Sequence, residues 1–314
     1  NADILDLNGM VNNGYPFFTW RVETVEISPS ANQTVTAGQT IDFDAYANDS
    51  DGNLLNGWDA VFTWTNADGN GTFDQTTAGV YEVTATYGDV TSEPVTVTVE
   101  PGAVNSVEIL PSADQTITAG QTIDFSASAY DMYGNLVNDS DTDFFWMNTD
   151  VEGIFGMSPA GDYDISAEYE NITSNIVTVT VEHGDAVGIT ITPVETTITA
   201  GNGESYTATA HDGHGNSWDV TGSTTWSDDV GSGSSWSGNT ITVTDAGTWN
   251  VTGTYDNGTA SLSDTAILNV EHADAQSLSL NPAYSMIDAG ESKSYSTTAK
   301  DMYGNTWDVT LGTS

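Results

Sequence analysis

Two short motifs recur along the chain at the same intervals, and this recurrence restricts the fold to a tandem array. The first motif centres on Ala-Gly, and its glycines are Gly38, Gly120, Gly201 and Gly290. The second motif is D-x-x-G-N, and it begins at Asp49, Asp131, Asp212 and Asp301. Both series have spacings of 82, 81 and 89 residues. Two motifs that keep one register indicate a repeated structural unit.

Within each unit the apolar residues have a period of two, as in Ile41, Phe43 and Ala45, which predicts half-buried strands. Further strands follow in the order of a tryptophan-bearing segment, an Ala-Gly turn and a closing segment such as V-T-V-T-V-E. About seven short strands with regular turn signals predict a β-sandwich. We therefore expect an all-β chain of tandem immunoglobulin-like β-sandwiches, and the short linkers predict an extended rod.

The register predicts five segments along the 314 residues: an N-terminal segment at 1–21, repeat 1 at 22–101, repeat 2 at 102–183, repeat 3 at 184–272 and a partial repeat 4 at 273–314. The partial repeat has only the opening strands, which cannot close a core alone. We expect either that the parent protein continues or that another chain supplies strands by addition to the open sheet.

The charge balance is extreme, with 45 acidic against three basic residues and a formal net charge of −42. Nucleic acid is excluded as a partner because phosphate contacts need Lys and Arg. Anionic membrane surfaces are disfavoured for the same reason. The acidic surface indicates a saline habitat and a solvated exterior.

The chain lacks cysteine, and its sequence contains no transmembrane run. Seven N-x-S/T triplets suggest export and glycosylation, at Asn32, Asn48, Asn70, Asn138, Asn171, Asn250 and Asn257. We therefore expect an extracellular or cell-surface location without direct membrane insertion.

Calcium is the one metal that the sequence suggests. Its candidate ligands are Asp49, Asp51 and Asn53 in one acidic loop, and Asp139 and Asp141 in another. The alternative is hairpin chemistry, in which Asp caps a turn and Gly-Asn supplies positive φ. No other cofactor is indicated.

Aromatic residues allow two interpretations. Trp64, Trp146 and Trp226 occupy equivalent strand positions and are predicted to pack in the sandwich cores. The less regular tryptophans, such as Trp218 and Trp236, could cover sandwich ends or grip sugar rings. His211 and His214 fall on a turn, where a solvated loop is favoured over a zinc site. No catalytic motif is found, so we expect a protein that is not an enzyme.

Repeats 1 to 3 resemble bacterial Ig-like domains of the invasin and intimin type through A-G-Q-T-I-D-F, D-M-Y-G-N and A-G-x-Y-x-V-T-A-T-Y. The segment D-x-x-G-N-x-W-D-V-T in repeats 3 and 4 is similar to arrays of archaeal surface proteins. The N-N-G-Y-P-F-F-T-W segment near the N-terminus resembles the closing segment of GLUG-type β-solenoid regions. These resemblances imply a surface protein with tandem β-sandwiches.

The sequence favours a non-catalytic structural role in an adhesin stalk, surface layer or filament, with neighbouring copies or other surface proteins as partners. Two alternatives stay open. The chain could be a module that binds glycans or proteins, or the accessory region of a secreted hydrolase.

Overall fold

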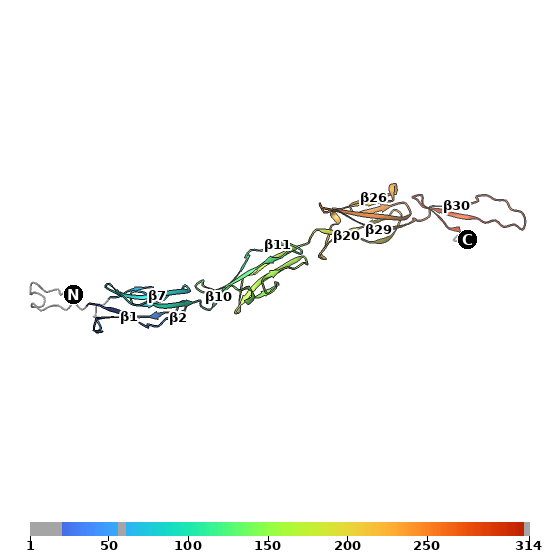
Figure 1. The fold of residues 1–314 in the computed structure, drawn as a ribbon. Coiled ribbons are helices and arrows are strands. Elements are labelled where there is room, and N and C mark those ends of the chain that lie inside the picture. The colour runs from blue at the N-terminus through green and yellow to red at the C-terminus, as the bar shows by residue number, and fades with distance from the viewer. Residues whose placement is uncertain (1–20, 56–60, 311–314) are drawn as a thin grey trace, which may run out of the picture. The chain divides into compact units, whose positions relative to one another are not determined.

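The computed structural model describes residues 21–55 and 61–310, which form β-strands joined by turns (Figure 1). The helical elements among them are three 3-10 turns, at Asp141–Asp143 (η1), Thr221–Ser223 (η2) and Gly231–Gly233 (η3). The N-terminal segment expected at 1–21 lies, apart from Arg21, outside the described residues. So does Trp58, another of the less regular tryptophans.

Repeat 1 contains two main sheets. The first pairs β1 (Thr24–Ser28) with β4 (Asp44–Asn48). The second has the order β2 (Gln33–Thr36), β9 (Val95–Glu100), β7 (Gly79–Tyr87) and β5 (Thr63–Thr65), with β8 (Val90–Thr91) on β7. A short ladder joins β3 (Ile41–Asp42) to β6 (Thr72–Phe73). The β2–β9 pairing is parallel, whereas the others in the second sheet for which a register is given are antiparallel.

Repeat 2 has the same arrangement with one more strand. Its first sheet has the order β10 (Val104–Leu110), β13 (Ser126–Asp131) and β14 (Leu136–Asn138). Its second sheet has the order β11 (Gln115–Thr118), β19 (Val177–Glu182), β17 (Gly161–Tyr169) and β15 (Phe145–Met147), with β18 (Ile172–Thr173) on β17. The short ladder joins β12 (Ile123–Asp124) to β16 (Ile154–Phe155).

Repeat 3 keeps this order with longer strands. Its first sheet has the order β20 (Ala186–Thr192), β23 (Thr207–Asp212) and β24 (Ser217–Asp219). Its second has the order β21 (Glu195–Thr199), β29 (Ser261–Glu271), β28 (Gly247–Asp256) and β25 (Thr224–Asp228). The short ladder expands to β22 (Gly203–Ser205), β27 (Thr240–Val243) and β26 (Ser234–Ser237).

Repeat 4 contributes one sheet, in the order β30 (Ser277–Asn281), β31 (Ser296–Lys300) and β32 (Thr306–Asp308). Every residue of β30 is exposed. Leu280 is 49% exposed, whereas Ile109 at the same position of repeat 2 is fully buried. Among the described residues, therefore, no second sheet covers the inner face of this strand.

The cores follow from the alternation of the strands. In β9 the valines Val95, Val97 and Val99 are buried and the intervening threonines are partly exposed, because successive side chains of a strand point to opposite faces. One core cluster draws all its buried residues from repeat 1, around Phe43 and Phe73. Another draws all of them from repeat 3, around Tyr206 and Leu268. The chain is thus all-β and built from tandem immunoglobulin-like sandwiches, as predicted.

The chain divides into two compact units, which are described separately. The first comprises Asn1–Gln115, Ile123–Phe155 and Tyr163–Val179, and the second comprises Thr116–Thr122, Gly156–Asp162 and Thr180–Ser314. The two turns Thr116–Thr122 and Gly156–Asp162 at the end of repeat 2 therefore group with repeat 3. The repeat boundaries and the rod stay predictions of the sequence.

Candidate functional site: the junctions between repeats

The Asp residue of the D-x-x-G-N motif organises its own turn. In repeat 2, Asp131 Oδ1 accepts hydrogen bonds from the backbone N–H groups of Tyr133 (2.8 Å) and Asn135 (2.9 Å). The Gly134 N–H donates to the Asp131 carbonyl at 3.1 Å, and Gly134 has φ +83°. Only glycine adopts this backbone conformation readily, which explains the G-N step of the motif.

The second carboxylate oxygen of the same residue holds the linker. Asp131 Oδ2 accepts the N–H of Gly102, at 2.8 Å, and the side-chain N–H of Asn135, at 2.7 Å. The linker and the turn are therefore bound to one carboxylate. Asp131 is only 3% exposed, and a buried carboxylate is tolerated when hydrogen-bond donors surround it.

The Asn residue of the motif reaches the preceding repeat. Asn135 Nδ2 donates to the Thr76 carbonyl at 2.8 Å, and Asn135 Oδ1 accepts the N–H of Ala78 at 2.7 Å. Thr76 and Ala78 lie in the turn just before β7. Its Ala78-Gly79 step is distinct from the repeated Ala-Gly motif of Gly38. One side-chain amide therefore satisfies both a donor and an acceptor of the neighbouring repeat's backbone.

The same set of bonds recurs at the two following junctions. Asp212 binds Gly184 (2.7 Å), and Asp301 binds Ala273 (3.0 Å). The Asn contacts to the preceding turn are Asn216 with Ser158 (3.0 Å) and Ala160 (2.7 Å), and Asn305 with Thr244 (2.9 Å) and Ala246 (2.9 Å). We call this Asp, Asn and linker arrangement the junction clasp.

A glycine of the preceding repeat completes each junction. Gly38 has φ +80°, and a Cβ atom there would overlap the phenol of Tyr133, which is the third residue of the next D-x-x-G-N motif. Gly120 faces His214 and Gly201 faces Tyr303 in the same way. The two sequence motifs that define the register are therefore the two contacting surfaces of one junction.

An aromatic stack covers two of the linkers. His183 stacks on Trp218 with ring centroids 3.6 Å apart, and His272 stacks on Trp307 at 3.5 Å. The His–Trp pair therefore joins the linker to the strand that follows the D-x-x-G-N turn at these two junctions. At the first junction the sequence has Pro101 and Val137 in the equivalent positions.

The hydrogen bonds also affect the acidity of the Asp side chains. Burial raises the pKa of Asp131, but the bonds from Asn135, Gly102 and Tyr133 outweigh this effect and lower the pKa to about 2. The same balance lowers the pKa of Asp212 and of Asp301. These carboxylates are therefore ionised at neutral pH and act as acceptors.

The calcium candidates lie in two different loops. Asp49 Oδ1 accepts the N–H groups of Asp51 (3.0 Å) and Asn53 (2.8 Å), and Asn53 Nδ2 donates to Asp49 Oδ2 at 3.0 Å. These bonds, with the Asn53 side chain first, lower the pKa of Asp49. The structure thus brings Asp49, Asp51 and Asn53 together in a turn that the Asp49 carboxylate holds. These are the bonds that the Asp of a junction clasp makes within its own turn.

The second pair has a different role. Asp141 Oδ1 accepts the Ala127 N–H at 2.7 Å, and Asp139 is exposed. Within residues 21–55 and 61–310, no three His, Asp or Glu side chains gather as a metal-binding group. Calcium at either loop stays a prediction, which a thermal melt with and without chelator would test.

The strand tryptophans face the cores. Trp146 is buried and donates to the Asp141 carbonyl at 2.9 Å. Trp64 and Trp226 are partly buried against the cores of repeats 1 and 3. Trp236 stacks on Trp226 and donates to Asp228 at 2.7 Å, so its ring is not free to form a flat sugar platform.

The seven glycosylation candidates differ in how their side chains are engaged. Asn171 is exposed, has φ +67° at the tip of the β17–β18 hairpin and has no hydrogen-bond partner among the described residues. Asn257 instead donates to the Ala186 carbonyl and accepts the N–H groups of Thr259 and Ala260. The remaining five are placed as follows: Asn32, Asn70 and Asn250 are exposed, and Asn48 and Asn138 are half-buried.

Sequence reasoning found the turn but missed the clasp. The Asn side chain contacts residues 56 to 61 positions earlier in the chain, and local turn chemistry does not indicate such a partner. The identical spacing of the Ala-Gly and D-x-x-G-N motifs was the available signal, because surfaces in contact must keep one register.

The comparisons with known proteins show limited similarity. No family model matches the chain. Ice-binding protein 1 of Shewanella frigidimarina (strain NCIMB 400) is 26% identical over 218 residues, which cover 65% of this chain and 24% of that protein. The chain therefore spans about a quarter of the length of this curated relative.

Among solved structures, surface layer protein SbsC, domains 1–6, is 17% identical with a TM-score of 0.33, covering 94% of this chain and 45% of that one. Protocadherin Gamma B2 extracellular cadherin domains 1–5 are 12% identical with a TM-score of 0.38, covering 82% and 60%. In the part of the chain that the structure describes, no helix is long and apolar enough to cross a membrane.

Proposed function

We propose that this chain is a structural spacer in an extracellular or cell-surface protein, such as an adhesin stalk, a surface layer or a filament. The junction clasp is the observation that carries the proposal. The same four groups (Asp, Asn, linker N–H and preceding turn) meet at three successive junctions. A chain that only needed separate binding modules would not need to bond each one to the next.

The energetics of the clasp favour stiffness. Each junction adds two hydrogen bonds between the Asn amide and the preceding turn, and one charge-assisted bond from the linker to Asp. Net contributions are about 0.5–1.5 kcal/mol for a neutral bond and about 1.5–3 kcal/mol for one to a charged group. Bending at the linker would break all three bonds together, so the clasp resists bending.

The acidic exterior fits the same role. A net charge of −42 keeps long surface proteins apart from one another and soluble in salt. The outer face of β9 carries Thr96 and Thr98, and that of β7 carries Glu82, Thr84 and Thr86 beside the exposed Val80. Glycans at exposed triplets would add to this solvated coat.

Small-angle scattering of the whole chain tests the proposal. We expect an elongated, stiff particle for the wild type and a more flexible one when Asn135, Asn216 and Asn305 are all changed to Ala. Circular dichroism is the control that the sandwiches stay folded. A compact particle, or equal flexibility of both proteins, would contradict a spacer.

A second candidate is an accessory region of an ice-binding protein, favoured by the alignment over 218 residues. Thermal hysteresis of the isolated chain distinguishes the two. A spacer gives none, whereas a chain that binds ice itself produces a concentration-dependent gap between melting and freezing points. The glycan-binding alternative predicts retention on immobilised sugars that is lost in Trp218→Ala.

A further inference from the structure

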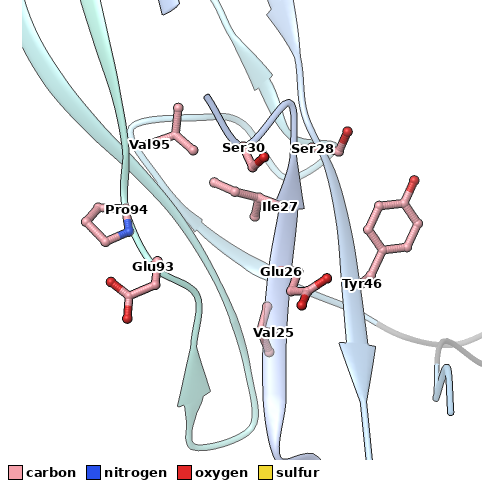
Figure 2. A pocket seen from close by; sticks show the side chains of 9 residues that line it. All are labelled: Val25, Glu26, Ile27, Ser28, Ser30, Tyr46, Glu93, Pro94 and Val95. Atoms are coloured by element: carbon pink, nitrogen blue, oxygen red, sulfur yellow. The ribbon is translucent and has the colours of Figure 1, made fainter. Parts of the chain in front are cut away.

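A groove of about 500 Å³ lies beside β1 in repeat 1. Figure 2 shows β1, with Val25, Glu26 and Ile27, between the segment Glu93–Val95 on one side and β4 on the other. Val25, Ile27 and Val95 form an apolar floor, because all three side chains are buried in the sandwich. The groove therefore lies at the seam between the two sheets.

Among the strands that the structure describes, β1 pairs with β4 alone and is therefore an edge strand. Ile27 lies opposite Ala45, as Ile191 lies opposite Ala208 in repeat 3. In repeat 3 the Ile191 N–H donates to Asp264 Oδ2 at 2.9 Å, away from the neighbouring strand. The matching register directs the Ile27 N–H into the groove. Among the described residues it has no acceptor there.

The wall opposite β1 differs between the two repeats by one extra residue in repeat 1. Val95 pairs with Val83 in repeat 1, and Ala266 pairs with Val251 at the same place in repeat 3. Ser92 lies opposite Ala85, with its N–H donating to the Ala85 carbonyl at 2.9 Å, and Asp264 lies opposite Gly253 at the same place in repeat 3. Two residues, Glu93 and Pro94, therefore stand in repeat 1 where repeat 3 has Thr265 alone. The extra residue interrupts the ladder between β8 and β9, whereas β29 is continuous. In repeat 3 Asp264 accepts the Ile191 N–H, whereas Ser92 at this place in repeat 1 is buried and accepts the Ala85 N–H.

The charge of the groove restricts its occupant. Glu26 and Glu93 are exposed on the strand β1 and on the opposite wall, respectively. A second copy of this chain has three basic residues and 45 acidic ones, so it would bring like charge to the groove. Cross-strand pairs of opposite charge stabilise a sheet, and like charges directly opposite destabilise it.

We propose that the β1 groove binds an extended segment of another protein by strand addition, with apolar residues alternating with Lys or Arg. The added strand bonds to the free backbone groups of Val25 and Ile27, its apolar side chains cover Val95 and Pro94, and its cations pair with Glu26 and Glu93. Edge strands and apolar grooves are a recurring mode of peptide recognition.

Titration of the whole chain with a synthetic peptide of alternating valine and lysine tests the proposal by calorimetry and amide hydrogen exchange. We expect saturable binding, together with slower exchange at the Ile27 amide. A peptide of alternating valine and glutamate is the control and should not bind. Failure of the lysine peptide to bind the wild type would overturn the proposal.

A net charge of −42 attracts any cationic peptide, so a second comparison is needed. A peptide of alternating proline and lysine carries the same charge as the valine and lysine peptide, but its prolines have no N–H and cannot complete a β-ladder. We expect affinity at least about tenfold lower, which corresponds to ~1.4 kcal/mol. Equal affinity, or binding without protection of Ile27, would overturn strand addition and leave general electrostatic attraction.

Discussion

Asn216 and Ala160 belong to different repeats, and the Ala160 N–H donates a 2.7 Å hydrogen bond to Asn216 Oδ1. The same Asn also donates to the Ser158 carbonyl, so its side-chain amide bonds to the backbone of a turn 56 to 58 residues earlier in the chain. Because Asp212 fixes this Asn and the linker N–H of Gly184 together, the turn, the linker and the preceding repeat depend on one carboxylate.

Removing the amide tests the clasp directly. Asn216→Ala leaves the Ala160 N–H and the Ser158 carbonyl without these partners, and the loss of a neutral hydrogen bond at such a solvent-accessible place costs about 0.5–1.5 kcal/mol. We expect faster hydrogen exchange of the Ala160 amide. Asn53→Ala is the matched control, since Asn53 occupies the same motif position but bonds within its own turn. Unchanged exchange at Ala160 would contradict a role for Asn216 in the junction.

Gly201 and Gly290 have similar backbone conformations but different surroundings. Substituting each one therefore separates the cost of backbone strain from the cost of a side-chain overlap. Gly201 has φ +90° and faces Tyr303, whereas Gly290 has φ +97° and no described atom within 4 Å of its Cβ position. Alanine at either position costs about 1–2 kcal/mol in this conformation. We expect Gly201→Ala to lower the free energy of unfolding further, because its methyl group displaces the phenol. Combining Tyr303→Ala with Gly201→Ala should remove this additional loss of stability. Denaturant titrations of the wild type, the two glycine variants and the double variant measure the free energy of unfolding.

Acid should weaken the first junction in a defined pH range. The folded-state pKa of Asp131 is about 2 and its ordinary value is 3.8, so its stabilisation is complete above about pH 4 and is lost as the pH falls through about 2. Asp131→Asn lacks the charge at every pH. We expect the free energy of unfolding of this variant to lie below that of the wild type by a constant amount near neutral pH. The difference should become smaller below pH 4. A deficit that stays constant down to pH 2 would contradict the lowered pKa.

The two edge strands should differ in amide exchange without any ligand. Ile191 donates to Asp264, whereas Ile27 has no described acceptor. We expect the Ile27 amide to exchange faster than the Ile191 amide, since exchange requires an unbonded N–H. Asp264→Ala should accelerate hydrogen exchange of the Ile191 amide and leave that of the Ile27 amide unchanged. Exchange rates measured by magnetic resonance check both statements.

We expect glycans on the Asn residues whose side-chain amides are exposed and are not engaged in hydrogen bonds. The Asn171 amide is exposed at a hairpin tip, whereas the Asn257 amide holds its own turn. In protein from its natural source we expect a glycan on Asn171 and none on Asn257. Peptide mapping by mass spectrometry measures both sites. A glycan on Asn257 with Asn171 bare would show that side-chain engagement does not select the site.

The sequence by itself determined the class of fold and the repeat. The alternation of V-T-V-T-V-E specifies which face of β9 is buried, because successive side chains of a strand point to opposite sides. The Gly-Asn step specifies a turn with positive φ at Gly134 and at Gly215. These are local consequences of side-chain period and backbone sterics, so they are readable from residues a few positions apart.

Only the tertiary structure decided what the recurring motifs contact. Whether Asn135 meets Thr76, and whether Gly38 meets Tyr133, depends on which surfaces two folded sandwiches bring together. The same holds for the edge beside Ile27, where Glu93 and Pro94 interrupt a ladder that is continuous in repeat 3. Such contacts join residues distant in the chain, and no local propensity encodes them.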